Sequence, residues 1–233
     1  MIETHAHLDF KQFNKDRQEV IARCFENGIK KIINISLDLS LLEKYKNIYG
    51  AVGYHPSEAD KFDLEKLKKL AKKAIAIGEI GLDSTKNNLE RQKEVFIEQL
   101  NLAKELDLPI IVHCRKLHDE VIKILNKDFR SVIHCFTGSL KQAQAYLNLG
   151  FYLSFTGLIT YDRSYDKVIL NTGLEKILLE TDCPFLAPAP YRGKRCEPWM
   201  VKFTAQKIAE IKNIGFDKVI EKTTKNAERL FKI

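Results

Sequence analysis

The feature that most constrains the fold is an alternation, along the whole chain, of short β-rich runs and longer segments with helical periodicity. The short runs are nearly continuous in apolar character, as is typical of parallel strands covered on both sides. Eight runs are expected to be strands: residues 1–7, 31–36, 51–55, 74–81, 109–113, 131–136, 151–155 and 176–182. Apolar residues recur at helical spacing in six other segments: residues 14–27, 63–73, 89–106, 139–148, 197–211 and 217–231.

Eight β/α units in 233 residues predict a closed (β/α)8 barrel of the α/β class, a TIM barrel that occupies residues 1–233 as a single domain. The alternative is an open, doubly wound sheet. Such a sheet normally carries a glycine-rich phosphate-binding loop after its first strand, and no such loop follows residues 1–7.

Composition narrows the class of protein. No apolar run approaches the roughly 20 residues of a membrane-spanning helix, and the first residues lack the features of a secretion signal. The five cysteines show no paired spacing, which favours reduced thiols. We therefore expect a cytoplasmic protein without membrane association, and a monomer is favoured. The net charge of +7 suits a polyanionic partner, although the lysine-rich segment 61–73 is interpreted as the solvated face of a helix.

Metal-binding residue types collect where the expected strands end. His5 and His7 close the first run, and side chains two apart along a strand point to the same side. The fourth, fifth, sixth and eighth runs carry the other candidates: Glu79, His113, His134 and Asp182. The C-terminal ends of barrel strands open on one face, where the active sites of this fold lie. These six residues are therefore predicted to form one metal site.

Six imidazole and carboxylate side chains exceed what a single tetrahedral ion needs, so we expect two ions that share a bridging carboxylate. Glu79 is the predicted bridge because its strand is central in the order. The first ion would be bound by His5, His7, Glu79 and Asp182, and the second by Glu79, His113 and His134. This mixture of ligands suits zinc, manganese, nickel or iron, with magnesium a less usual fit. The cofactor prediction is one or two divalent ions.

Three neighbouring residues are interpreted as structural. Cys114 and Cys135 directly follow two candidate ligands, so strand alternation turns them toward the helix layer. His118 falls at the start of a helix and is expected to face solvent.

Long, ordered motifs carry a family resemblance. They are His5-Ala6-His7-Leu8-Asp9, Gly53-Tyr54-His55-Pro56, Gly78-Glu79-Ile80-Gly81-Leu82-Asp83, His113-Cys114-Arg115, His134-Cys135-Phe136-Thr137-Gly138 and Glu180-Thr181-Asp182-Cys183-Pro184. These motifs resemble the TatD family of metal-dependent deoxyribonucleases, and the match continues to Phe231. The resemblance implies an amidohydrolase-type TIM barrel, one or two divalent metals, DNase activity and the same six ligands.

Three positions depart from the usual pattern of that family. Lys116 follows Arg115 where the family usually has an acid, and a polar run begins at Ser84 where aromatic residues are usual. Cys196 stands where the family generally has asparagine. These changes leave the ligand set intact and bear on substrate preference.

The expected reaction is hydrolysis of DNA phosphodiester bonds by metal-activated water, which leaves 5′-phosphates. Asp182 is the predicted general base, and it forms the catalytic pair with Glu79. Two rival interpretations use the same residues or the same scaffold. One is a metallohydrolase of a small ester, lactone or amide; the other is a non-enzymatic nucleic-acid- or metal-binding protein, which the complete ligand set disfavours.

Substrate contacts are predicted on the same face. Arg192, Lys194 and Arg195 follow the eighth strand, and Arg115 follows a ligand, so these cations can reach backbone phosphates. His55, at the end of the third expected strand, is a further candidate, and the alternative is a structural histidine before Pro56. No DNA-reading module is visible, so DNA binding is expected to be independent of sequence.

Overall fold

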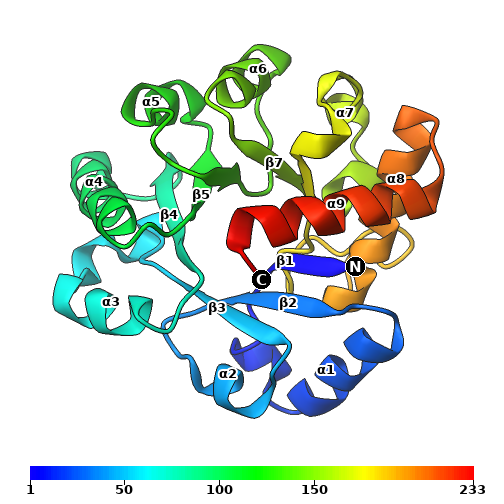
Figure 1. Ribbon diagram of the computed structural model, residues 1–233, viewed down its shortest axis with the longest axis horizontal. Helices are drawn as coiled ribbons and strands as arrows, with labels where there is room; N and C mark the ends of the chain where they lie inside the picture. Colours follow the sequence, from blue (N-terminus) through cyan, green and yellow to red (C-terminus); the bar gives the residue numbers. More distant parts are fainter.

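Eight parallel strands follow one another in chain order around a ring in the computed structural model, which describes residues 1–233 (Figure 1). Their bounds are β1 Ile2–Ala6, β2 Lys31–Ile35, β3 Ile48–Val52, β4 Ala76–Asp83, β5 Ile110–Arg115, β6 Ser131–Ile133, β7 Tyr152–Phe155 and β8 Ile177–Leu179. Main-chain contacts between the ends of β1 and β8 close the ring, because Asp182 N donates to His5 O at 3.0 Å and His7 N donates to Cys183 O at 3.0 Å. The predicted barrel is confirmed.

Helices surround the ring of strands (Figure 1). Their bounds are α1 Arg17–Glu26, α2 Ser40–Lys44, α3 Leu64–Ala71, α4 Leu89–Glu105, α5 His118–Ile124, α6 Leu140–Asn148, α7 Asp166–Asn171, α8 Val201–Lys212 and α9 Phe216–Phe231. The sequence did not predict α2 and α7, and of α5 it predicted only the start at His118. These helices have only 5, 6 and 7 residues and are too short to show a clear period. None of these helices combines the length and the apolar character that a bilayer crossing requires.

Local signals in the sequence set the limits of several helices. The side chain of Asn88 caps α4 by accepting from Arg91 N, and Ser139 opens α6 with a reciprocal capping box to Gln142. After α1 and α6 the chain turns at Gly28 and Gly150, whose φ angles of +82° and +89° favour glycine. These helix ends fix where each connection returns to the barrel.

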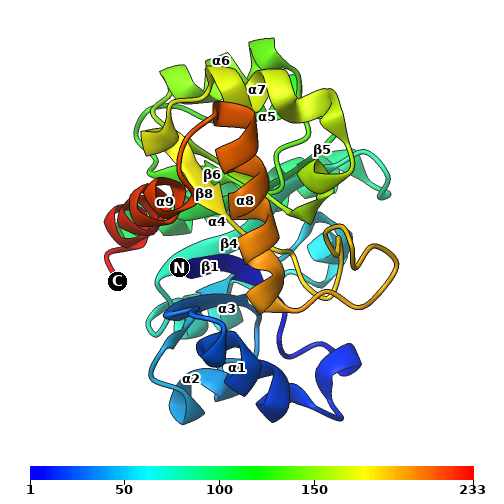
Figure 2. The ribbon, with the colours of Figure 1, turned by 90° about the vertical axis from the view of Figure 1, so that its right-hand side faces the viewer.

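The last helix seals one end of the barrel. Ala227, Leu230 and Phe231 of α9 belong to a 12-residue apolar cluster with the inward-facing residues of the strands. Asn226 Nδ2 donates to Leu174 O and Ile177 O, both at 2.8 Å, at the start of β8. Figures 1 and 2 show α9 across this end of the barrel, and the long connection after β8 on the opposite side. The C-terminal ends of the strands therefore form the open end.

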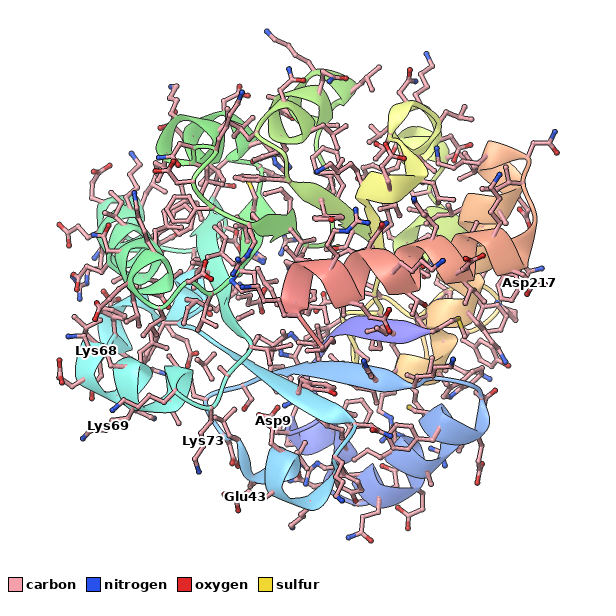
Figure 3. The ribbon with its side chains drawn as sticks, viewed as in Figure 1. Asp9, Glu43, Lys68, Lys69, Lys73 and Asp217 are labelled. Atoms are coloured by element: carbon pink, nitrogen blue, oxygen red, sulfur yellow. The ribbon has the colours of Figure 1, made fainter.

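The lysine-rich segment lies on the outside of the molecule, as interpreted from the sequence. Figure 3 shows Lys68, Lys69 and Lys73 pointing away from the core. Lys68 Nζ lies 3.1 Å from Glu65 Oε1, and Lys73 Nζ lies 3.7 Å from Glu43 Oε1. Both pairs are exposed, so this segment is a solvated helix face and not a binding surface by itself.

The limits of several strands differ from the expectation, and β6 and β8 each end three residues early, at Ile133 and Leu179. The third strand is Ile48–Val52, because it pairs with β2 through Ile32 and Ile48 at its beginning. His55 therefore lies beyond the strand, where it precedes a short 3-10 helix, Pro56–Lys61. The fourth strand continues to Asp83, so Glu79 lies in the middle of β4. Pairing with β5, which extends as far as Asp83 opposite Arg115, supports this extra length.

Candidate metal centre

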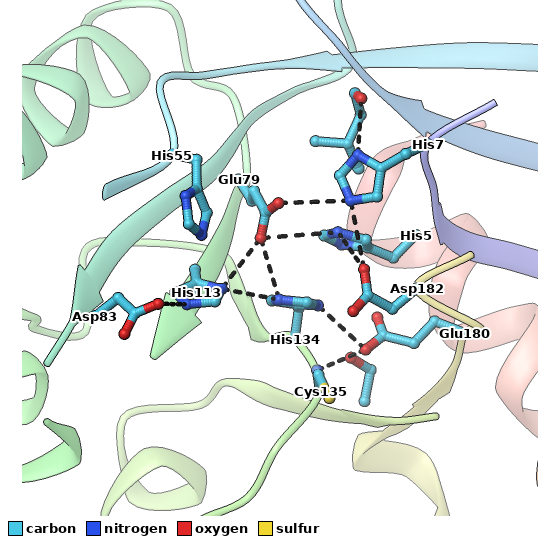
Figure 4. Close-up of polar contacts among 12 residues, drawn as sticks. His5, His7, His55, Glu79, Asp83, His113, His134, Cys135, Glu180 and Asp182 are labelled. Atoms are coloured by element: carbon cyan, nitrogen blue, oxygen red, sulfur yellow. Dashed lines mark hydrogen bonds and ion pairs between the residues drawn. The ribbon is translucent and has the colours of Figure 1, made fainter. Parts of the chain in front are cut away.

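All six candidate ligands come together at the open end of the barrel (Figure 4). His5 lies in β1 and His7 directly after it, while Glu79 and His113 lie in β4 and β5. His134 and Asp182 lie just beyond β6 and β8. Each side chain is largely buried, as expected when parallel strands converge on one site.

Two backbone features bring these side chains close. Gly81 has a φ of +145°, and a Cβ at this position would lie 2.0 Å from His113 O, so β4 can approach β5 only with glycine here. Asp182 has a φ of +58°, in the left-handed region that few residues other than glycine adopt. That turn follows directly on β8 and holds Asp182 beside β1, as its main-chain bond to His5 shows.

Glu79 is the centre of the arrangement. Its Oε2 lies 3.2 Å from His113 Nδ1, 3.1 Å from His134 Nε2 and 3.9 Å from His5 Nε2. Its Oε1 lies 3.5 Å from His7 Nε2. Glu79 therefore belongs to two groups of possible ligands at once, one with His5 and His7 and the other with His113 and His134. A carboxylate in this position could be shared by two ions, as the sequence predicts for Glu79.

Asp182 completes the first group. Its Oδ1 lies 3.3 Å from His7 Nε2 and 3.8 Å from His5 Nε2. The same carboxylate forms a third group of possible ligands with His5 and His134. The structure thus brings together every residue that the sequence proposed as a ligand.

The spacing of these atoms fits a bound cation better than direct hydrogen bonds. Two ligands about 2.1 Å from a tetrahedral ion lie about 3.4 Å apart, and the distances of 3.1–3.9 Å around Glu79 and Asp182 bracket this value. Both nitrogens of the fully buried His5 ring have no hydrogen-bond partner. A buried imidazole without partners is costly unless something coordinates it. The donor set of four imidazoles and two carboxylates fits a transition-metal ion such as zinc, manganese, nickel or iron.

The charged groups of the cluster shift one another's pKa values. Burial by itself raises the pKa of the Glu79 carboxyl, but the imidazoles of His134, His113 and His5 outweigh it and hold that pKa well below its usual value. Burial likewise raises the pKa of Asp182, and contacts with His7, His134 and His5 lower it overall. Both carboxylates are therefore ionised at neutral pH and available to a cation.

Comparisons with known proteins agree with this site. The sequence model described as "TatD related DNase" matches residues 2–232. The chain belongs to the TatD family. It is 40% identical to YabD of Bacillus subtilis, an uncharacterized metal-dependent hydrolase, over 100% of this chain and 99% of YabD. It is 35% identical to the metal-dependent hydrolase MJ1582 of Methanocaldococcus jannaschii, over 99% of this chain and 96% of that protein.

Comparison with solved structures also points to the TatD family. The crystal structure of YjjV, a TatD homolog from Escherichia coli, superposes with a TM-score of 0.93 at 32% identity and covers 100% of this chain and 98% of YjjV. A phosphotriesterase homology protein from Escherichia coli shares only the fold, at 14% identity and a TM-score of 0.71. The protein is thus a metal-dependent hydrolase of the TatD family with a single-domain barrel.

Three further groups lie behind the imidazoles of this TatD family member. His113 Nε2 faces Asp83 Oδ2 at 3.5 Å, and His134 Nδ1 faces Glu180 Oε1 at 3.4 Å (Figure 4). His7 Nδ1 lies 3.2 Å from Ile35 O. Partners on the far side of a ring fix its orientation and raise the basicity of the coordinating nitrogen. This role of Asp83 and Glu180 was not predicted, although Glu180 precedes Asp182 by two residues and Asp83 is the last residue of the motif that contains Glu79.

The residues predicted to contact the substrate differ in how exposed they are and in what they contact. His55 packs its ring 4.4 Å from that of His113, its Nδ1 is bonded to Ser57, and burial lowers its pKa to about 4. Arg115 is exposed at the end of β5. The Arg192 guanidinium lies 4.4 Å from the centroid of the Tyr161 ring, and Lys194 Nζ lies 5.8 Å from that of Tyr191. The side chains of Arg115, Arg192 and Lys194 are exposed, so their charges face the solvent.

Arg195 is placed differently from the expectation. Its guanidinium lies 2.6 Å from Asp16 Oδ2 and 2.9 Å from Glu197 Oε1, and it also donates to Gln12 O. The hydrogen bond from Arg195 lowers the pKa of Asp16. With its donors engaged in this way, Arg195 ties the connection after β8 to the start of α1, and the expectation that it binds phosphate is not supported. The cause is a pair of carboxylates. Asp16 lies 179 residues earlier in the chain, and Glu197 lies two residues later.

Two structural interpretations are wrong. His118 is buried, not solvent-facing, because the start of α5 packs against α6, where the Tyr146 hydroxyl lies 3.2 Å from His118 Nδ1. Cys114 is buried in the large apolar core, as expected, whereas Cys135 is not part of it. Since β6 ends at Ile133, strand alternation no longer applies to Cys135, whose Sγ faces the Thr156 hydroxyl at 3.7 Å.

Proposed function

We propose that the protein hydrolyses phosphodiester bonds of DNA without sequence preference and leaves 5′-phosphates. The observation that carries the proposal is the position of Glu79 between two groups of imidazoles, which suits a pair of cations on either side of a scissile phosphate. Membership of a family described as "TatD related DNase" supports the same substrate.

Each side chain has a defined part in this reaction. His5 and His7 with Asp182 would hold one cation, His113 and His134 the other, and Glu79 both. Bound there, divalent cations lower the pKa of water and neutralise charge on a phosphoryl group. Asp83 and Glu180 keep the rings of His113 and His134 in the orientation that coordination needs.

Asp182 is the proposed general base. Its lowered pKa keeps it ionised at neutral pH, and both of its close contacts, with His5 and His7, are made through Oδ1. Oδ2 can therefore accept the proton from water while the water oxygen bonds to phosphorus. The bond from phosphorus to the 3′-oxygen breaks, solvent protonates that oxygen, and the products are a 3′-hydroxyl and a 5′-phosphate.

Cations around the open end would bind the phosphates on either side of the reacting one. Arg115 is exposed there, and the contacts of Arg192 and Lys194 with aromatic rings leave their charge free for an anion. Contacts of this kind position a nucleic-acid backbone and carry no sequence information. The net charge of +7 adds a general attraction that should weaken as salt is added.

The test is cleavage of end-labelled single- and double-stranded DNA by protein reconstituted with manganese or zinc, beside a panel of small esters and lactones. DNA cleavage that leaves 5′-phosphate ends, and that a chelator abolishes, is the expected result. Hydrolysis of the small esters without any cleavage of DNA would replace the proposal with a small-molecule metallohydrolase.

A further inference from the structure

One large apolar side chain stands in solvent beside the metal centre. Phe185 is 48% exposed and lies in the connection after β8, three residues beyond Asp182. The other exposed large apolar residues lie on helices or at a helix end: Ile97, Leu106, Leu140, Leu170 and Phe216. Exposure of an aromatic ring next to a catalytic site is a sign of a ligand contact.

The exposure of Phe185 does not come from a loosely held loop. Pro184 and Ala187 on either side of it are buried. The main chain is fixed as well, since Phe185 N donates to Asp182 O at 3.0 Å and Cys196 N donates to Pro184 O at 3.0 Å. A well-anchored backbone therefore presents this one ring to the solvent.

A second ring fixes the orientation of the first. Phe185 meets Phe10 edge to face, with 6.1 Å between the ring centroids and 76° between the planes. Phe10 in turn stacks on the candidate ligand His7, at 4.6 Å and 24°. The aromatic pair, Phe10 and Phe185, is thus built directly onto the metal centre and leads from it to the solvent.

We propose that the aromatic pair is a stacking site for one unpaired nucleobase of the substrate, with Phe185 in contact with the base. The inference rests on the proposed function. Every base has an apolar face that can stack on an aromatic ring, so such a contact is tolerant of sequence. It complements the cations Arg115, Arg192 and Lys194, whose charge suits phosphates. A base inside a duplex has both faces covered by its neighbours, so this site takes a base at a strand end or in a single strand.

The experiment compares two probes that have no phosphodiester bond to cleave. One is 2-aminopurine deoxyriboside 5′-monophosphate, and the other is 2-deoxyribose 5-phosphate, which has the sugar and phosphate without the base. Calorimetry measures the affinity of metal-loaded protein for each probe, and the 2-aminopurine fluorescence reports stacking directly. The variants are Phe185→Leu, which removes the ring, Phe185→Tyr, which keeps it, and Phe216→Leu, a matched change on α9 at the sealed end.

The wild type should bind the nucleotide more tightly than the base-free probe and quench its fluorescence. Phe185→Leu should bind the nucleotide about tenfold more weakly, which corresponds to about 1.4 kcal/mol for one stacked base. The same variant should bind 2-deoxyribose 5-phosphate normally, and Phe185→Tyr and Phe216→Leu should match the wild type with both probes.

Four results would overturn the inference. Equal affinity of the wild type for both probes, together with cleavage of DNA, would leave the proposed function standing and remove the stacking site. Equal weakening of both probes by Phe185→Leu would mean that the residue supports the centre and not the base. A change from dimer to monomer in sedimentation of Phe185→Leu would mean that a second copy of the chain covers Phe185. Failure of the wild type to bind either probe or cleave DNA would refute the proposed function as well.

Discussion

The contact between Asp83 and His113 can be tested by Asp83→Asn, a change that keeps the size of the side chain and removes its charge. The Asp83 side chain is 2% exposed, and its Oδ2 lies 3.5 Å from His113 Nε2. His113 Nδ1, on the other side of the ring, faces Glu79 at 3.2 Å. Asp83 can thus act on the metal centre through the orientation and basicity of this imidazole, although its carboxylate also forms a group of possible ligands with His55 and His113.

The size of the effect follows from this geometry. Loss of a partner behind a coordinating histidine typically weakens metal binding 10- to 100-fold, about 1.4–2.8 kcal/mol. A contact of 3.5 Å is long for a hydrogen bond, and asparagine keeps an acceptor oxygen, so the lower end of this range is expected. Asp83→Asn should therefore bind its second metal ion about tenfold more weakly, with little change in the fold.

The assay is a titration of metal-depleted protein with zinc in competition with a chromogenic chelator. Thr85→Ala is the matched control, because Thr85 donates to Asp83 Oδ1 at 2.7 Å through both its amide and its hydroxyl and does not contact His113. That variant should keep the affinity of the wild type. If Asp83→Asn binds zinc as tightly as the wild type, or if Thr85→Ala loses affinity to the same extent, the positioning role is refuted.

Three other substitutions test separately the residues proposed for catalysis and those proposed for stability. Asp182→Asn should keep the circular dichroism spectrum and lower kcat 10²- to 10⁴-fold, about the contribution of a general base; full turnover in a metal-loaded sample would exclude that role. Arg195→Ala should lower Tm by about 1–4 °C, because its partly exposed ion pairs contribute about 0.5–1 kcal/mol, and should leave KM for DNA unchanged. Since the pKa of Asp16 is lowered in the folded state, this difference in Tm should be complete above about pH 4 and shrink as the pH falls further. Phe231→Ala should cost about 3–5 kcal/mol in urea unfolding, since the side chain is 2% exposed inside the barrel end; a loss below 1 kcal/mol would mean that α9 does not seal the core.

The candidate ligands could be predicted from the sequence because each depends on short-range geometry. His5 and His7 share a side of one strand, and the other ligands lie in or directly after strands whose apolar runs are readable. Once eight such strands are expected to close in chain order, their C-terminal ends must meet on one face. The predicted set of ligands therefore did not depend on the exact limits of any strand. It was correct although the expected limits of β3 were wrong by several residues.

The residues that were predicted wrongly depend on partners far away in the chain. Arg195 has its charge engaged by Asp16, which is 179 residues earlier, and His118 is covered by Tyr146 of the following helix. Nothing in the local pattern around either residue indicates those contacts. The predicted direction of the Cys135 side chain was wrong for a different reason. The alternation of side chains along a strand was applied to a residue that lies beyond the end of β6.

The two ends of the barrel have different roles: the sealed end stabilises the fold, and the open end carries the candidate metal centre. At the sealed end, α9 contributes apolar side chains to the interior of the barrel and Asn226 satisfies backbone carbonyls there. At the open end, four imidazoles and two carboxylates are buried with few hydrogen bonds, an arrangement that costs folding free energy unless a cation binds. Because metal binds only the folded chain, its binding free energy adds to the stability of the fold. A chelator should therefore lower the stability of the wild type, and by less in Asp83→Asn, whose weaker site has less binding free energy to lose.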